Sequence, residues 1–206
     1  RGYAVFGNLT RVVKFRQETI ALWAQVLHRV PDAKLLLKDR RLDGVNAQRI
    51  LSMFERQEIG AERLILKEGS SQSEHLAAYG DVDIVLDCVP QSGGVSTLEA
   101  LWMGVPVISL WHPTKPTGRF GGYILSKFGL PALATDCEDD FIALAERLAR
   151  SPDVLGTLRR GLRPRLARSP LCDAQTFQRG VAAAFRQMWI RYCNNQEPES
   201  FTVSAS

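Results

Sequence analysis

A glycine-rich segment near the middle of the chain contains the residues best suited to chemistry. Paired glycines let a backbone approach a ligand closely, and the first N–H groups of a helix attract anions. We therefore expect the N–H groups of residues 94–97 and the hydroxyls of Ser96 and Thr97 to face an anion. The segment, which runs directly into a helical pattern, reads Ser92-Gly93-Gly94-Val95-Ser96-Thr97.

Glu99 follows one turn inside the same predicted helix. A carboxylate at that place could accept hydrogen bonds from the hydroxyl groups of a sugar or a ribose. An anion site beside a diol acceptor suits a nucleoside diphosphate. A glycine turn with an ordinary helix cap is the alternative that spacing alone leaves open.

Short apolar runs alternate with helical patterns over most of the 206 residues. This alternation predicts an α/β fold: a Rossmann-like, mostly parallel sheet with helices on both faces. Ligands of such sheets bind beyond the carboxyl ends of the strands, where the glycine segment falls. The turn after the first strand has no GxGxxG, which disfavours a dinucleotide-dependent dehydrogenase. The predicted strands are Tyr3–Gly7, Lys34–Leu37, Leu64–Lys67, Asp83–Leu86, Pro106–Leu110 and Ala132–Thr135.

Apolar periodicity and helix-end residues predict the helices. Ser71 and Glu74 have the spacing of a capping box, Gly104 and Gly129 follow two helices, and Asp136 is expected to cap another. Residues 1–193 should form one lobe that includes terminal helices over 136–193, followed by a flexible tail over 194–206. The main helices expected are Glu18–Val30, Asn46–Glu58, Ser96–Met103, Arg119–Phe128, one from Asp136 to Arg150, one opening at Pro152, and Asp173–Tyr192.

Composition excludes several classes of protein. The chain is 45% hydrophobic with a net charge of +4, and no apolar run is long enough to span a membrane. The first residues do not form a signal peptide. The four cysteines lie far apart, which predicts neither a disulfide framework nor a zinc site but a reducing compartment. Arginines between Arg147 and Arg168 alternate with leucines, which favours solvated helix faces over a nucleic-acid site.

The segment SGGVSTLEALWMGVPVI, which begins at Ser92, resembles the donor site of GT-B glycosyltransferases, in the carboxy-terminal half of that fold. Further motifs in the same order are similar to the O-linked N-acetylglucosamine transferase family, and the resemblance covers about Tyr3 to Tyr192. These motifs are Lys14 ahead of Trp23–Pro31, Glu74-His75, Leu86-Asp87, Leu101–Pro106, Ser169–Cys172 and Met188-Trp189.

This resemblance implies a role for individual residues. Lys14 matches the family lysine that contacts the donor pyrophosphate and stabilises the leaving nucleoside diphosphate. His75 matches the histidine that packs on uracil, with the backbone near Gly69 and Ser70 at the edge of the base. Glu99 takes the place of the acidic ribose ligand.

Four positions depart from the family pattern. Gly94 and Val95 stand where the animal enzymes have histidine and threonine. Gln72 replaces a lysine near the base, and Arg11 replaces a glutamine and could add positive charge at the phosphates. The donor is expected to be a UDP-sugar, UDP-N-acetylglucosamine first, with UDP-glucose and GDP-fucose left open.

The function that the resemblance implies is the donor-binding lobe of an inverting glycosyltransferase acting on protein Ser/Thr side chains. The resemblance to GT-B enzymes, which use a lysine and a helix N-terminus in place of a divalent ion, implies a metal-independent enzyme without a cofactor. No general base is evident, and the abrupt start at Arg1 suggests a preceding lobe and tetratricopeptide repeats. The chain alone is then expected to be inactive, and the protein cytoplasmic. The alternatives are another GT-B enzyme (an epimerase or a small-molecule or lipid glycosyltransferase) and a non-catalytic nucleotide-binding module.

Overall fold

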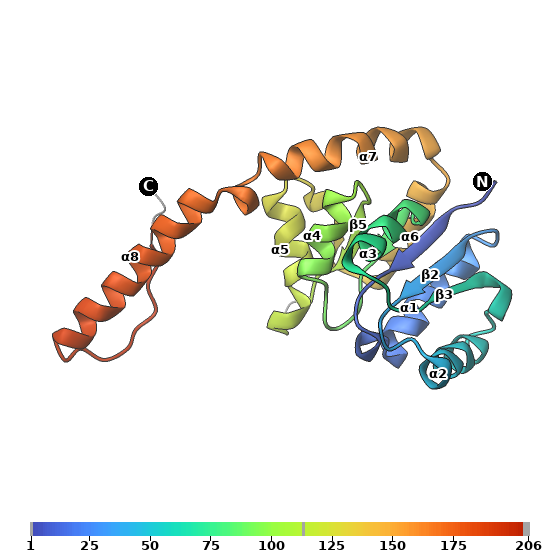
Figure 1. The fold of residues 1–206 in the computed structure, drawn as a ribbon, viewed down its shortest axis with the longest axis horizontal. Coiled ribbons are helices and arrows are strands. Elements are labelled where there is room, and N and C mark those ends of the chain that lie inside the picture. The colour runs from blue at the N-terminus through green and yellow to red at the C-terminus, as the bar shows by residue number, and fades with distance from the viewer. Residues whose placement is uncertain (1, 113, 204–206) are drawn as a thin grey trace.

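The computed structural model describes residues 2–112 and 114–203, which contain one sheet of six parallel strands (Figure 1). The spatial order is β3-β2-β1-β4-β5-β6, so the direction of winding reverses between β1 and β4. This is the Rossmann order, and the predicted α/β class is confirmed. The strands are β1 (Val5–Asn8), β2 (Lys34–Lys38), β3 (Leu64–Lys67), β4 (Ile84–Leu86), β5 (Val107–Leu110) and β6 (Ala134–Thr135).

Continuous apolar runs form the strands because both faces of a parallel sheet are covered. Phe6 of β1 lies between Leu35 of β2 and Ile84 of β4, and all three side chains are buried. The predicted strand β3 matches at both ends, and the ends of the other strands differ from the predicted ends by at most two residues. Such shifts are typical of sequence-based boundaries, since hydrogen bonding rather than apolarity defines the ends.

Right-handed connections place α1 and α2 on one face of the sheet and α3, α4 and α5 on the other. The next two helices add to both faces: α6 packs on α1, and α7 packs on α4. The helices are α1 (Gln17–Arg29), α2 (Gly44–Glu55), α3 (Gln72–Ala77), α4 (Val95–Trp102), α5 (Phe120–Lys127), α6 (Glu138–Ala149), α7 (Pro152–Ala167) and α8 (Ala174–Cys193).

Several helix ends match their predicted signals. The Ser71–Glu74 capping box is present at the start of α3. Gly104 and Gly129 follow α4 and α5 with φ of 78° and 76°, a conformation that favours glycine. The prediction that Asp136 caps α6 is wrong. The N-cap residue of this helix is Cys137, and no side chain accepts a hydrogen bond from the first turn.

Some arginines of the arginine-rich region make contacts within the fold, whereas the sequence predicted solvated helix faces. Leu155 and Leu162 of α7 are buried, as expected. Arg159 and Arg163, however, donate to backbone carbonyls of Val82 and Trp102, at 2.7 and 2.6 Å. These arginines fasten α7 to the rest of the fold.

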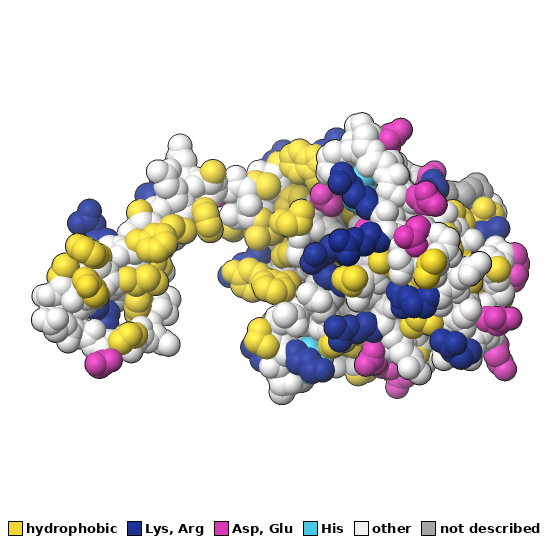
Figure 2. Space-filling model, turned by 60° about the horizontal axis from the view of Figure 1, so that its bottom comes forward, with side chains coloured by type: hydrophobic (Ala, Val, Ile, Leu, Met, Phe, Trp, Pro, Cys, Tyr) yellow, Lys and Arg dark blue, Asp and Glu magenta, His cyan; other side chains and the backbone are white. Residues whose placement is uncertain are grey.

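The last helix, α8, extends away from the body of the molecule, as Figure 1 shows. None of its residues is buried. Apolar side chains are spread along it in the space-filling view (Figure 2). The core therefore ends with α7 and the short turn that follows it.

Candidate functional site

The polar side chain of Asn8 joins the two strands at which the winding direction reverses. It is fully buried at the end of β1, and its Nδ2 donates to the carbonyl of Leu86 at the end of β4, at 2.7 Å. Its Oδ1 accepts from the N–H and the hydroxyl of Thr10, at 2.9 and 2.6 Å. Asn8 thus sets the path of the loop that leads to Arg11.

A pocket of about 230 Å³ opens at the carboxyl ends of the first three strands. It brings together five of the predicted site residues, which are Arg11, Gly69, Ser70, His75 and Glu99. They come from the loops after β1 and β3 and from helices α3 and α4. The other lining residues are Leu9, Thr10, Lys38, Asp39, Arg40 and Gln72.

His75 of α3 and Glu99 of α4 face each other. His75 Nε2 lies 3.7 Å from Glu99 Oε2, and Gln72 Nε2 donates to the other carboxylate oxygen at 3.5 Å. Tyr79 supports both helices: its ring meets His75 edge-on at 6.0 Å, and its hydroxyl donates to the carbonyl of Ser96 at 3.2 Å. A flat ring and a carboxylate are therefore held side by side at the pocket.

Asp87 organises the loop between β4 and α4. Its buried carboxylate accepts from the N–H groups of Gly93 and Cys88, at 2.7 and 2.9 Å, and from the Ser109 hydroxyl, at 2.8 Å. Burial raises the pKa of Asp87, while these hydrogen bonds and the charge of Lys14 act in the opposite direction. Asp87 appeared in the sequence only as part of a family motif, although a lone acid directly after a buried strand is itself a signal.

Lys14 lies beside the same loop. Its Nζ donates to the carbonyl of Ser92 at 2.9 Å, one residue before the paired glycines. The short turn that carries it is fixed by Asp39, whose carboxylate accepts from the N–H of Val12 at 2.8 Å. Lys14 thus places a positive charge next to the start of α4 rather than in the wall of the pocket.

The start of α4 has backbone N–H groups without a partner in the described chain, at part of the predicted anion site. Gly94 is the first residue before the helix, and no side chain caps it. Within the described residues, the N–H groups of Gly94, Val95 and Ser96 have no hydrogen-bond acceptor. The expectation for Thr97 is wrong, because its N–H donates to the Gly94 carbonyl at 3.1 Å and its side chain is buried.

Known proteins are similar to this chain over most of its length. A family model described as Glycosyl transferase family 41 matches residues 2–181. The chain belongs to this family. A Hordeum vulgare relative is 34% identical over 202 residues, covering 96% of this chain, and is named "Probable UDP-N-acetylglucosamine--peptide N-acetylglucosaminyltransferase SPINDLY". The chain spans only 21% of the length of that relative.

Two solved structures share the fold. An O-GlcNAc transferase from Thermobaculum terrenum matches with a TM-score of 0.88 and 34% identity, over 95% of this chain and 38% of that one. The Anabaena protein HepE, solved with UDP and glucose, matches with a TM-score of 0.59 and 13% identity, over 80% of this chain and 44% of that one. The family 41 chain therefore has the expected carboxy-terminal GT-B architecture.

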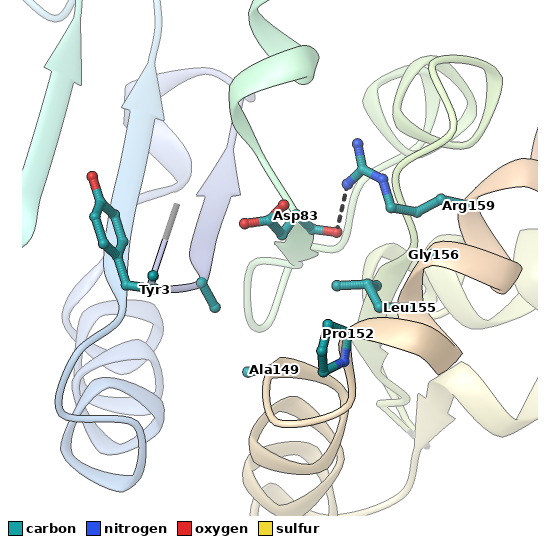
Figure 3. A pocket seen from close by; sticks show the side chains of 9 residues that line it. Tyr3, Asp83, Ala149, Pro152, Leu155, Gly156 and Arg159 are labelled. Carbon is teal, nitrogen blue, oxygen red and sulfur yellow. Dashed lines mark hydrogen bonds between the residues drawn. The ribbon is translucent and has the colours of Figure 1, made fainter.

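A second hollow, of about 460 Å³, lies at the amino ends of the strands, on the edge of the sheet opposite the pocket described above. Figure 3 shows Tyr3, Asp83, Leu155 and Arg159 around it. Here Arg159 donates to the Asp83 carbonyl at 2.9 Å, and the Asp83 carboxylate accepts from the N–H of Val5 at 2.8 Å. These contacts hold strand starts to α7, so the hollow is a structural junction.

Within residues 2–112 and 114–203, no helix combines the length and apolarity needed to cross a membrane. No three His, Cys, Asp or Glu side chains there are grouped as ligands of a metal ion.

Proposed function

We propose that the pocket at the carboxyl ends of β1, β2 and β3, together with the adjoining start of α4, binds the nucleoside diphosphate of a UDP-sugar, with UDP-N-acetylglucosamine as the first candidate. The observation that carries the proposal is the convergence of the His75–Glu99 pair, Lys14 and the uncapped start of α4. These groups follow the order of a nucleotide sugar: a ring for the base, a carboxylate for the ribose hydroxyls, and positive charge for the diphosphate.

In the proposed reaction, an acceptor hydroxyl of a protein Ser or Thr attacks the anomeric carbon with inversion. The bond to the diphosphate breaks, and its electron pair stays on the departing oxygen. Lys14 and the N–H groups of Val95 and Ser96 stabilise that developing charge, so this chain supplies leaving-group stabilisation without a metal ion. The acceptor protein loses the hydroxyl proton to a base that we assign to the rest of the longer protein.

The remaining parts of the reaction are assigned to a longer protein. We propose that a preceding lobe with tetratricopeptide repeats provides the acceptor site and the base, as the relatives' greater length suggests. The chain alone should then bind the donor without transferring sugar. A cytoplasmic location fits the widely spaced cysteines of the sequence.

A nucleotide titration tests the proposal. We expect UDP to stabilise the chain in a thermal-shift assay and to bind in calorimetry, and Lys14→Ala to weaken binding about tenfold through loss of a charged contact. Lys127→Ala is the matched control, because Lys127 lies at the end of α5 against Tyr123. A response to GDP but not UDP would change the assigned donor. No response to either nucleotide, or equal affinities for wild type and Lys14→Ala, would contradict the proposal.

A further inference from the structure

Lys38, the last residue of β2, is a buried cation in the wall of the pocket. The residue is only 5% exposed, and its Nζ donates to the carbonyl of Glu68 at 2.6 Å. Within the described residues this is its one hydrogen bond, and the Glu74 carboxylate, whose pKa is lowered by hydrogen bonds from Ser71 and by the charge of Lys38, forms neither a hydrogen bond nor an ion pair with it. A buried ammonium with three N–H groups and a single partner is costly unless another acceptor reaches it.

The hydrogen bond of Lys38 ties the end of β2 to the loop after β3. That loop continues through Gly69, where a Cβ atom would lie 2.6 Å from the Cα of Arg40. The two loops are therefore in direct contact, and together they form one wall of the pocket. Lys38 lies where these two loops meet, at the end of β2. Lys14 follows β1, which is one strand closer to β4 than β2 is.

This position separates Lys38 from the proposed diphosphate site. Under the proposed function, the phosphates lie at Lys14 and the start of α4, and the ribose lies near Glu99. The base then extends toward the loops after β2 and β3, where Lys38 is buried. An ammonium only donates hydrogen bonds, so it favours a base with a carbonyl oxygen and disfavours an exocyclic amino group.

We propose that Lys38 determines base specificity by donating to a carbonyl oxygen of the nucleotide base. It would favour the oxo bases uracil and guanine over adenine, which presents an amino group and no carbonyl. The energetic reason is that the base oxygen supplies the second acceptor that the buried ammonium lacks. This inference rests on the proposed function, since it requires a nucleotide in the pocket.

Calorimetric titration of UDP and ADP into wild type, Lys38→Met and Lys34→Met tests the inference. Wild type should bind UDP at least tenfold more tightly than ADP. Lys38→Met should lose most of that preference by weakening UDP, with ADP changed less than twofold. Lys34→Met is the control at the other end of the same strand, where Lys34 lies over the ring of Tyr3, and it should behave as wild type.

The outcomes separate this inference from the proposed function. Equal weakening of UDP and ADP in Lys38→Met would overturn it, because the ammonium would then act on the phosphates or on the wall alone. Wild type that binds UDP and ADP equally would also overturn it, even if Lys38→Met fails to fold, and would leave the nucleotide site standing. Wild type that binds no nucleoside diphosphate would refute the proposed function and this inference together.

Discussion

Gly93 and Gly94 are neighbours with different structural requirements. A Cβ atom at Gly93 would press against Thr97 Oγ1 and lie 3.0 Å from Ser96 Oγ, whereas a Cβ atom at Gly94 meets no atom within 4 Å. The close packing at Gly93 lets Asp87 reach its N–H group. The glycine at position 93 therefore belongs to the architecture of the turn, and the one at position 94 leaves room for a ligand.

We expect Gly93→Ala to lower the free energy of unfolding by about 1–3 kcal/mol, as overpacking usually does. Gly94→Ala should cause a smaller loss because its new methyl group points into open space. Urea denaturation of the two variants measures the difference. Equal losses would show that the contacts around Gly93 do not control the turn.

Asp87 should make stability depend on pH in a predictable direction. Burial raises its pKa in the folded chain above the value of about 3.9 that applies when unfolded. Folding therefore favours the protonated acid, so its stabilising contribution is complete below about pH 4 and is lost as pH rises through the folded pKa. The free energy of unfolding of wild type, relative to Asp87→Asn, should fall over that interval. A difference that stays constant or rises with pH would contradict this assignment.

At the scale of elements, the short helix α3 presents His75 to the pocket, and the capping box holds its first turn. The Ser71 hydroxyl accepts from the N–H of Glu74, and the Glu74 carboxylate accepts from the N–H of Ser71 at 3.0 Å. Hydrogen bonds from Ser71 lower the pKa of Glu74, so the carboxylate stays ionised at neutral pH. The cap is thus coupled to the position of the ring.

Ser71→Ala should cost about 1 kcal/mol in the free energy of unfolding, the usual value for an N-cap. It should also weaken UDP binding, because a frayed α3 no longer fixes His75. Ser52→Ala on the exposed side of α2 is the control and should change neither quantity. Weakened stability with unchanged UDP affinity would separate α3 from the site.

The elements and the glycine turn could be predicted from the sequence because their signals are local. Apolar runs, capping residues and helix-ending glycines act within a few positions. The role of Lys38 depends on Glu68, 30 residues away, and that of Asn8 depends on Leu86, 78 residues away. Such pairings arise only when the strands assemble, so no local pattern could show them.

At the scale of the whole molecule, α8 stands apart from the core. Its exposed apolar side chains include Phe177, Phe185 and Trp189, and none of its residues is buried. The side chains that complete the core on this side, Leu162 and Leu166, belong to α7. The helix therefore contributes little to the stability of the domain that holds the pocket.

Truncation after Asp173 should accordingly change the melting temperature by less than about 3 °C, since a shift of that size reflects roughly 1 kcal/mol in a chain of this length. Truncation after Ser151, which also removes α7 and its buried leucines, should unfold the chain and serves as the contrasting variant. A large loss on removing α8 alone would show that it stabilises the body of the molecule.

Under the proposed function, a nucleoside diphosphate binds in the pocket at the carboxyl ends of β1, β2 and β3 and against the start of α4. Amide chemical-shift mapping during a UDP titration reports this binding residue by residue. We expect saturable shifts for Arg11, Gly69 and Ser70 and for Val95 at the start of α4, with Gly156 in the hollow at the amino ends of the strands unchanged. Saturable shifts confined to that opposite hollow, or none at the pocket, would contradict it.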